Sequence, residues 1–281
     1  MSIDPRPHPN KRMYYDANTK GRDFVVGDLH GCIKDLLDML VLLNFDASVD
    51  RVFCVGDLVD RGPDSLKTAK LIYEPWFNTV KGNHEQLMID TLINEDRNMS
   101  SCWFQNGGDW NFSHDQGELT ALARDLKSLP LVICVGEGEN RFNIVHAELT
   151  HRPTVDGHRS PVPVTDQMIL KWVFDEHDEQ EMIWGRTMVQ WAQELNPSDV
   201  RFHSKELSPT YVGHTPIGKS IQIEQMIYID TGAVFHHYHK CTSDIYALTI
   251  AEPNKKVLHK FSIMHRTLET IPQAELLKYC Q

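Results

Sequence analysis

The sequence Gly56-Asp57-Leu58-Val59-Asp60-Arg61-Gly62 directly follows the apolar run Val52-Phe53-Cys54-Val55. Gly82-Asn83-His84-Glu85 follows a second short run at residues 77–80, and Gly27-Asp28-Leu29-His30-Gly31 follows Phe24-Val25-Val26. Short apolar runs that end in glycine and a polar cluster are typical of buried parallel strands. Such strands present side chains at their carboxyl ends, where open α/β sheets bind ligands. The three polar clusters therefore predict a metal site with a phosphate-binding clamp.

The periodicity around these clusters predicts alternating strands and helices. Apolar residues recur at helical spacing over 33–45, and helices are predicted at 63–72 and 83–94. Strand–helix alternation predicts a parallel sheet with helices on both faces. The next predicted elements are a helical region at 100–129 broken near 106–108, a hairpin of strands 131–135 and 142–145, a surface loop at 150–164, helices at 166–174 and 186–194, and a solvated acidic segment at 176–181 between those helices. The last third is predicted to contain a strand at 210–212, a second hairpin of strands 220–223 and 226–229, strands at 245–250 and 256–261, and a terminal helix at 268–277. Together they predict an α/β fold with two mixed sheets packed as a sandwich and flanked by helices.

The composition is that of a soluble globular protein, with 281 residues, 41% apolar and 24% charged. A formal charge of −11 argues against general nucleic-acid binding. No run of about 18 apolar residues predicts a membrane span, and the polar stretch at 1–19 does not resemble a secretory signal. We therefore expect a cytoplasmic protein whose scattered cysteines are reduced, with Cys54 and Cys134 buried.

Six residues that can ligate a metal each stand at the end of a predicted strand: Asp28, His30, Asp57, Asn83, His146 and His214. Asp28 and His30 are separated by one residue, so in an extended chain both can reach one ion. Asp57 ends the next strand, and its carboxylate can bridge two ions. Mixed carboxylate, amide and imidazole ligands suit Mn²⁺, Fe or Zn²⁺ rather than a thiolate site. The alternative, polar turn residues and core histidines, suits one isolated residue better than six in this arrangement.

The three clusters resemble the signature motifs of the phosphoprotein phosphatase family of metallophosphoesterases, in particular its bacteriophage λ and bacterial members. The similarity runs from about Arg12 to about Ile250. It includes WFQNGGDW at 103–110, VHA at 145–147, IWGR at 183–186, GHTP at 213–216 and YIDTGAVF at 228–235. The resemblance implies a metallophosphoesterase domain over 23–262, an N-terminal tail at 1–22 that leads into the first strand, and a C-terminal extension at 263–281.

The resemblance also implies roles for the residues that match. Two divalent ions are expected, Mn²⁺ foremost and Fe or Zn²⁺ as alternatives, one held by Asp28, His30 and Asp57 and the other by Asp57, Asn83, His146 and His214. Arg61 and Arg186 would bind the phosphate, and His84 would be the general acid with Asp60 hydrogen-bonded behind it. Two ions about 3.5–4 Å apart can share a hydroxide that attacks the phosphate, and guanidinium groups match phosphate oxygens bidentately. Arg61 alone would suggest a surface ion pair, but its position after Asp60 favours the clamp; Arg186 rests on a shorter match.

The expected function is hydrolysis of phosphoserine and phosphothreonine in a phosphoprotein or phosphopeptide substrate, with phosphotyrosine as an extension. A symmetrical dinucleoside-tetraphosphate hydrolase is the rival enzyme, but Asp60-Arg61 and His84-Glu85 follow the phosphatase pattern. A non-catalytic phosphate-binding module is a third hypothesis, which the intact ligands and acid disfavour. No membrane or nucleic-acid partner is expected. The cluster at 236–240 (HHYHK) departs from the family pattern, and we predict a polar loop there, with a metal-binding or substrate-contacting rim as the alternative.

Overall fold

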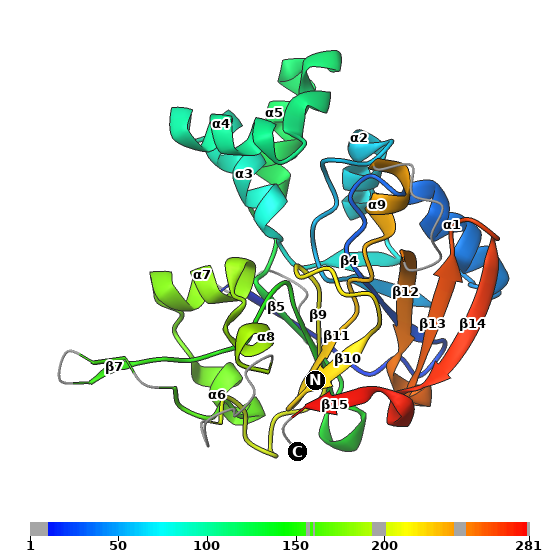
Figure 1. Cartoon of the computed structure of the whole chain (residues 1–281), viewed down its shortest axis with the longest axis vertical. Helices are drawn as coiled ribbons and strands as arrows, with labels where there is room; N and C mark the ends of the chain where they lie inside the picture. The colour runs from blue at the N-terminus through cyan, green and yellow to red at the C-terminus, as the bar shows by residue number, and fades with distance from the viewer. Residues whose placement is uncertain (1–10, 156–157, 160, 193–200, 239–245, 280–281) are drawn as a thin grey trace.

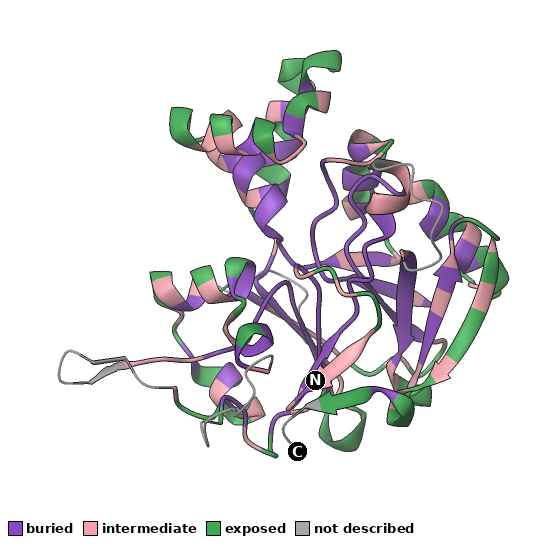
Figure 2. Ribbon diagram, viewed as in Figure 1, coloured by how far each residue is buried: buried purple, intermediate pink, exposed green. Residues whose placement is uncertain are grey.

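The protein is a sandwich of two mixed sheets with helices on the outside (Figure 1). The computed structural model describes residues 11–155, 158–159, 161–192, 201–238 and 246–279. Figure 2 shows that the strands in the centre are buried, whereas the outer surfaces of the helices are exposed. This arrangement confirms the predicted fold class.

The six-stranded sheet contains the three strands that lead to the polar clusters. Its order is β14 (Thr267–Pro272), β13 (Val257–Ser262), β12 (Ala247–Glu252), β2 (Asp23–Val26), β3 (Arg51–Cys54) and β4 (Phe77–Thr79). β2, β3 and β4 are parallel, as predicted, and β12 joins β2 in the antiparallel sense. Parallel neighbours end at the same sheet edge, so the three polar clusters meet there.

The seven-stranded sheet is assembled from hairpins and from both ends of the described chain. Its order is β1 (Arg12–Tyr15), β5 (Val132–Val135), β6 (Phe142–Val145), β9 (Thr210–Val212), β11 (Met226–Tyr228), β10 (Ile221–Ile223) and β15 (Leu277–Tyr279). β5–β6 and β10–β11 are antiparallel hairpins, which confirms both hairpin predictions. β6, β9 and β11 are parallel neighbours, so the residues that follow β6 and β9 also lie at one edge.

A buried apolar layer joins the two sheets. Val25 and Phe53 of the six-stranded sheet pack in one cluster with Ile133 and Phe142 of the seven-stranded sheet. The Phe53 and Phe142 rings meet edge to face at 6.1 Å. Neighbouring residues in β2 point to the opposite face, where Phe24 and Val26 belong to the cluster under α1 (Ile33–Leu42). Both faces of β2 are therefore covered, which explains why its sequence is continuously apolar.

Helices cover the outer face of each sheet (Figure 1). The cluster over the six-stranded sheet includes side chains from α1 and from an arm formed by α3 (Asn83–Leu92), α4 (Arg97–Gln105), η2 (Gly108–Ser113) and α5 (Gln116–Leu126). The break in this arm confirms the interruption predicted near 106–108. The remaining helices are α2 (Ser65–Ala69), η1 (Lys70–Tyr73), η3 (Gly138–Asn140), α6 (Asp166–Lys171), α7 (Glu176–Trp184), α8 (Thr187–Ala192), α9 (Ala233–Tyr238), η4 (Pro253–Lys255) and η5 (Gln273–Glu275). None of the helices in the described ranges is long and apolar enough to cross a membrane.

Both ends of the described chain differ from the sequence prediction. Residues 12–15, predicted as part of a tail, form β1 and pair in parallel with β5. Residues 268–277, predicted as a helix, contain β14, which pairs with β13 along its whole length, and the start of β15. Apolar residues at 268 and 271 fit a helix, but pairing with a distant strand decides the structure. The predicted boundaries at 22 and 262 therefore do not separate a tail or an extension from the sheets.

Three internal predictions also need correction. The acidic segment 176–181, predicted to be solvated, is exposed or partly exposed except at Asp178, but it is helical and begins α7. Asp175 and Asp178 form a capping box there, and acidic residues in a first turn stabilise a helix through its dipole. The predicted loop at 150–164 contains a small hairpin of β7 (Thr154–Val155) and β8 (His158–Arg159). The predicted loop at 236–240 is helical as far as residue 238 in α9, and residues 239–240 lie outside the described ranges.

Candidate active site

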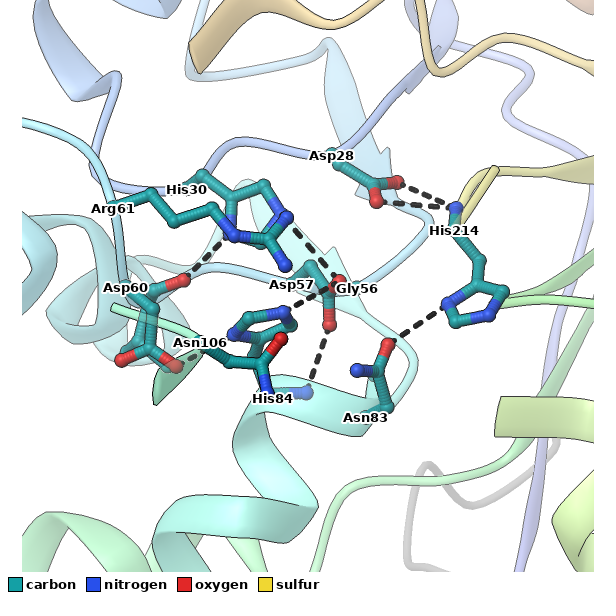
Figure 3. Close-up of polar contacts among 12 residues, drawn as sticks. Asp28, His30, Gly56, Asp57, Asp60, Arg61, Asn83, His84, Asn106 and His214 are labelled. Carbon is teal, nitrogen blue, oxygen red and sulfur yellow. Dashed lines mark hydrogen bonds and ion pairs between the residues drawn. The ribbon is translucent and has the colours of Figure 1, made fainter. Parts of the chain in front are cut away.

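The loops that follow five strands of the two sheets converge at one buried point. Figure 3 shows Asp28, His30, Asp57, Asn83 and His214 gathered there. Asp28 and His30 follow β2, Asp57 follows β3, and Asn83 opens α3 after β4. From the other sheet, His146 follows β6 and His214 follows β9. All six predicted metal ligands are buried, with at most 7% of their surface exposed. Strand ends from both sheets therefore bring together the residues that the sequence analysis selected.

Asp57 lies between two groups of these side chains. Its Oδ2 lies 3.5 Å from His30 Nε2, and its Oδ1 lies 3.4 Å from His146 Nε2. Asn83 Oδ1 in turn lies 2.9 Å from both His146 Nε2 and His214 Nδ1. Among the described residues, the potential ligand atoms of Asp57, His146 and His214 all lie within 4.8 Å of one another. His30, Asp57 and His84 meet the same limit, although the resemblance gave His84 a different role.

The outer nitrogens of two histidines are fixed by backbone carbonyls. His30 Nδ1 lies 2.8 Å from the Val59 carbonyl oxygen, and His146 Nδ1 lies 2.8 Å from that of Val55. When Nδ1–H donates to a carbonyl, Nε2 of a neutral imidazole is left as the acceptor, which is the arrangement of metal-binding histidines. Both Nε2 atoms face Asp57.

Asp28 is oriented differently from the other predicted ligands. Its carboxylate accepts a hydrogen bond from the His214 backbone N–H at 3.1 Å. Burial, followed by the charges of Asp230 and Asp57, raises the pKa of Asp28 well above its ordinary value. Burial also raises the pKa of Asp230 to about 6. Asp230 belongs to the YIDTGAVF stretch, but its position carried no signal that it would approach Asp28.

The residues at this point fit divalent cations. His214 Nε2 is buried and has no hydrogen-bond partner among the described residues. Burial lowers the pKa values of His30, His146 and His214, the last to about 3, so the imidazoles are neutral as metal ligation requires. Several buried carboxylates face neutral imidazoles, and bound cations would offset that negative charge.

Glu85 joins the loops that follow β3 and β4. Its carboxylate accepts hydrogen bonds from the backbone N–H groups of Asp57 at 2.9 Å, Leu58 at 2.8 Å and Gly82 at 2.9 Å. Gly82 permits this approach, because a Cβ atom there would lie 2.2 Å from Asp57 Oδ1. The sequence analysis assigned Glu85 no structural role, although a glutamate three residues after a helix N-cap is a capping signal.

His84 and Asp60 form a buried pair beside the predicted metal ligands. His84 Nδ1 lies 2.6 Å from Asp60 Oδ2, and Asp60 is completely buried. Burial opposes protonation of His84, but the charges of Asp57 and Asp60 outweigh it and raise the pKa of His84. This is the contact that the sequence analysis expected between the two residues.

A cavity of about 480 Å³ opens over this group. Its lining brings Arg61 and Arg186, which are 125 positions apart in the chain, together with His84. Arg61 Nη1 lies 3.1 Å from His30 Nε2, so its guanidinium borders the metal ligands. The full lining is Asp57, Arg61, Asn83, His84, Gln105, Asn106, Trp184, Arg186, His214, Pro216 and Phe235. The sequence analysis did not select Gln105, Asn106, Trp184 or Phe235, because amide and aromatic residues on helices carry no distinctive spacing.

The histidine cluster near residue 236 does not join the cavity lining in the described part of the chain. His237 Nε2 lies 2.6 Å from Asp35 Oδ2, which joins α9 to α1. Arg266 Nη1 donates to the other Asp35 oxygen at 2.5 Å. His237 therefore helps to join α9 to α1 through its contact with Asp35, and residues 236–238 are helical rather than a loop.

Comparisons with known proteins agree with this geometry. The family profile described as calcineurin-like phosphoesterase matches residues 24–217. Serine/threonine-protein phosphatase 1 of Salmonella typhimurium is 32% identical over 217 residues, which cover 75% of this chain and 87% of that protein. Serine/threonine-protein phosphatase 2 of Escherichia coli is 31% identical with the same coverages. The symmetrical bis(5'-nucleosyl)-tetraphosphatase of Methylococcus capsulatus is 35% identical over 126 residues, covering 44% of this chain and 42% of that protein.

Solved structures share the fold at low sequence identity. A protein serine/threonine phosphatase from Saccharomyces cerevisiae superposes with a TM-score of 0.59 and 18% identity, covering 94% of this chain and 84% of that one. A cold-active protein-tyrosine phosphatase of a Shewanella species has a TM-score of 0.50 and 14% identity, covering 94% and 83%. At these identities the likeness establishes the arrangement of the sheets and no finer property.

Proposed function

The chain belongs to the calcineurin-like phosphoesterase family, and from this premise we propose that it is a metal-dependent phosphatase of phosphoserine and phosphothreonine in proteins. The single observation that carries the proposal is the buried His84–Asp60 pair, 2.6 Å apart, in the lining of a cavity that also holds Arg61. A serine or threonine alkoxide is a poor leaving group and needs a proton donor in this place. The relatives named as serine/threonine phosphatases support this choice, because they match 75% of the chain.

The metal-binding residues would divide into two groups that share Asp57. Asp28 and His30 would complete one group, and Asn83, His146 and His214 would complete the other. When bound, divalent ions polarise phosphate oxygens and activate the attacking water. The nitrogen and oxygen donors support Mn²⁺ as the ion, with Fe or Zn²⁺ as alternatives.

The two arginines would bind the phosphate group of the substrate. Guanidinium groups present paired N–H donors that match two phosphate oxygens, which an ammonium group does not. Arg61 and Arg186 line the cavity together, so both can contact one phosphoryl group. Their charge would stabilise the transition state if the contacts strengthen as the phosphoryl group becomes planar.

His84 would donate the proton that the leaving oxygen requires. Its Nδ1 is occupied by Asp60, which leaves Nε2 to face the cavity. The carboxylate of Asp60 favours the charged imidazolium and fixes its orientation. Since the pKa of His84 is raised, a larger fraction of the imidazole would carry the proton near neutral pH.

A second candidate function is hydrolysis of symmetrical dinucleoside tetraphosphates. Proteins named as such hydrolases match part of the chain, one at 45% identity over 64 residues. These matches cover 22% to 44% of the chain, much less than those of the phosphatases. The aromatic rings of Trp184 and Phe235 in the cavity lining would suit a nucleobase as well as a peptide.

A direct comparison of substrates tests the proposal. Purified protein with Mn²⁺ is assayed on a phosphoserine peptide and on diadenosine tetraphosphate, alongside the His84→Asn variant. We expect a higher kcat/KM for the peptide, and a loss of about 10²–10⁴-fold on the peptide in the variant. Preference for diadenosine tetraphosphate would replace the first function by the second.

A further inference from the structure

The Asp60 carboxylate is held by two indole groups in addition to His84. Trp103 Nε1 donates to both carboxylate oxygens, at 3.0 and 2.9 Å. Trp110 Nε1 donates to Oδ1 at 2.6 Å. The Asp60 backbone is fixed as well, since its N–H donates to Ser65 Oγ at 2.9 Å. A carboxylate with no exposed surface is thus surrounded by ring N–H donors.

This arrangement solves a specific problem of a buried acid–base pair. An ionised carboxylate removed from water is strongly destabilised unless hydrogen bonds replace its hydration. Indole N–H groups supply these bonds without a charge of their own. Indole is also a donor only, so its nitrogen does not compete as an acceptor. The indoles therefore satisfy the Asp60 carboxylate oxygens and fix the carboxylate against His84 Nδ1.

The same stretch of chain also supports Arg61. The Arg61 backbone N–H donates to the Gly107 carbonyl oxygen at 3.2 Å. Gly107 has a φ of +98°, and a Cβ atom there would lie 2.8 Å from Arg61 Cγ. Gln105 and Asn106, in the same stretch, line the cavity. Residues 103–110 thus contact both Asp60 and Arg61 while two of their side chains face the substrate space.

We propose that Trp103 and Trp110 are positioning residues that hold Asp60 against His84 and so direct proton donation to the leaving group. The proposal rests on the proposed function, since it assumes that His84 is the general acid. Neither indole is among the described residues that line the cavity, so both act through Asp60. Trp103 also belongs to the buried core, whereas Trp110 is partly exposed, which makes Trp110 the cleaner test.

The test uses substrates whose leaving groups differ in their need for a proton. Trp110→Phe and Trp103→Phe keep an aromatic ring but remove the N–H donor. We expect each to lower kcat on a phosphoserine peptide about tenfold more than on p-nitrophenyl phosphate, whose leaving group needs little protonation. Asp60→Asn and His84→Asn should show the same bias, in stronger form.

Trp172→Phe is the matched control for losing an indole–carboxylate bond. Trp172 Nε1 donates to Asp178 Oδ2 at 2.9 Å, in the cluster under α6–α8 and outside the described cavity lining. We expect Trp172→Phe to lower the melting temperature while leaving the ratio of the two kcat values unchanged. Equal losses on both substrates in Trp110→Phe and Trp103→Phe would mean that these indoles are structural only, and would overturn the proposal.

A second measurement separates this inference from the proposed function. The indole N–H resonances of Trp103 and Trp110, assigned by NMR with the Phe variants, should move in Asp60→Asn, while that of Trp172 should not. If His84→Asn and Asp60→Asn show no leaving-group bias, the general-acid assignment fails and the inference fails with it. If they show the bias but the tryptophan variants do not, the inference alone is wrong.

Discussion

Several residues of the candidate active site hold backbone conformations that L-amino acids rarely adopt. Positive φ angles occur at His30 (+39°), Asp57 (+51°), Asp60 (+75°), Arg61 (+68°) and His214 (+64°). Aspartate and histidine tolerate this region better than most residues, but arginine does not. Each such residue costs on the order of 1–3 kcal/mol, which the surrounding hydrogen bonds must offset. For His30 this also corrects the expectation that Asp28 and His30 converge by lying in an extended strand, since they converge through a turn.

The roles of the residues at this site could be inferred from the sequence to different degrees. Asp57 and Asn83 were predictable because each directly follows a short run that ends in glycine. The bond from Trp110 to Asp60 was not, because 50 positions separate the two residues and tryptophan in a helical pattern suggests a core residue. Glu148 was not selected from the sequence, although its burial and its contacts give it a defined place.

Glu148 fixes the start of α8 and with it the backbone of Arg186. Its fully buried carboxylate accepts hydrogen bonds from Met188 N–H at 2.9 Å, Val189 N–H at 3.2 Å and the Tyr228 hydroxyl at 3.1 Å. Glu148→Gln replaces one acceptor oxygen by an amide donor and should weaken this capping by about 1–2 kcal/mol. If Arg186 shifts as a result, kcat/KM on a phosphopeptide should fall about 10–100-fold.

A double-mutant cycle decides whether Glu148 acts through Arg186. The double variant Glu148→Gln, Arg186→Ala should be no less active than Arg186→Ala alone, because the second change removes what the first displaces. Steady-state kinetics on the four proteins gives the coupling. Losses that multiply would show that Glu148 affects activity by another route.

At the scale of elements, a strand or helix could be predicted where its local sequence pattern determines it and was missed where pairing with a distant strand does. β2, β3 and β4 were predictable because an apolar run buried on both faces is recognisable without knowledge of its neighbours. β1 was missed because its structure comes from pairing with β5, about 120 residues later. The helix α7 was missed because its acidic first turn was interpreted as a sign of solvation, and its buried apolar residues, Met182 and Ile183, lie only near its end.

The buried, neutral side chain of His203 connects the segment that begins at residue 201 to the chain that follows β6. His203 Nε2 donates to the Leu149 carbonyl oxygen at 2.9 Å, and Glu224 Oε2 lies 3.4 Å from its Nδ1. Burial lowers the pKa of His203 to about 4. Below the ordinary histidine pKa of about 6.5, the unfolded chain binds a proton that the folded chain does not. Stability from this residue is therefore complete above about pH 6.5 and is lost as the pH falls toward 4.

Substitution of His203 by glutamine tests this pH dependence. His203→Gln keeps a donor that can reach the Leu149 carbonyl but cannot take up a proton. Between about pH 7 and pH 4.5 the wild type should lose up to about 2–3 kcal/mol relative to the variant. Urea unfolding at both pH values measures the difference, and the histidines of the candidate metal centre contribute equally because both proteins contain them. A difference that stays constant with pH would contradict a depressed pKa for His203.

At the scale of the whole molecule, the candidate metal centre lies where the two sheets meet. Asp28, His30, Asp57 and Asn83 come from the six-stranded sheet, and His146 and His214 come from the seven-stranded sheet. The apolar layer between the sheets ends at this point, and three buried carboxylates, Asp28, Asp57 and Asp230, lie near its edge. In the absence of cations, burial and mutual repulsion raise the pKa values of Asp28 and Asp230, which opposes the packing of the sheets at neutral pH. Bound ions would reverse that effect and join the sheets.

Metal binding should therefore raise the melting temperature of the whole protein. Substitution of Asp28 should have opposite effects on stability in the metal-free and the metal-bound protein. A chelator should lower the melting temperature, and Mn²⁺ should raise it, since a ligand at about 100 times its Kd adds about 2.7 kcal/mol. In Asp28→Asn the metal-free protein should melt at the wild-type temperature or higher. Burial raises the pKa of the Asp28 carboxyl, which destabilises the folded state at neutral pH, and an amide removes this cost while its oxygen can still accept from the His214 N–H. The rise with Mn²⁺ should be smaller in this variant, because one ligand is lost.

His259→Gln is the control: His259 is a buried histidine of β13 outside the described cavity lining, and its variant should keep the full Mn²⁺ response. Calorimetry with chelator and with Mn²⁺ on the three proteins gives the result, and an unchanged Mn²⁺ response in Asp28→Asn would remove Asp28 from the metal centre.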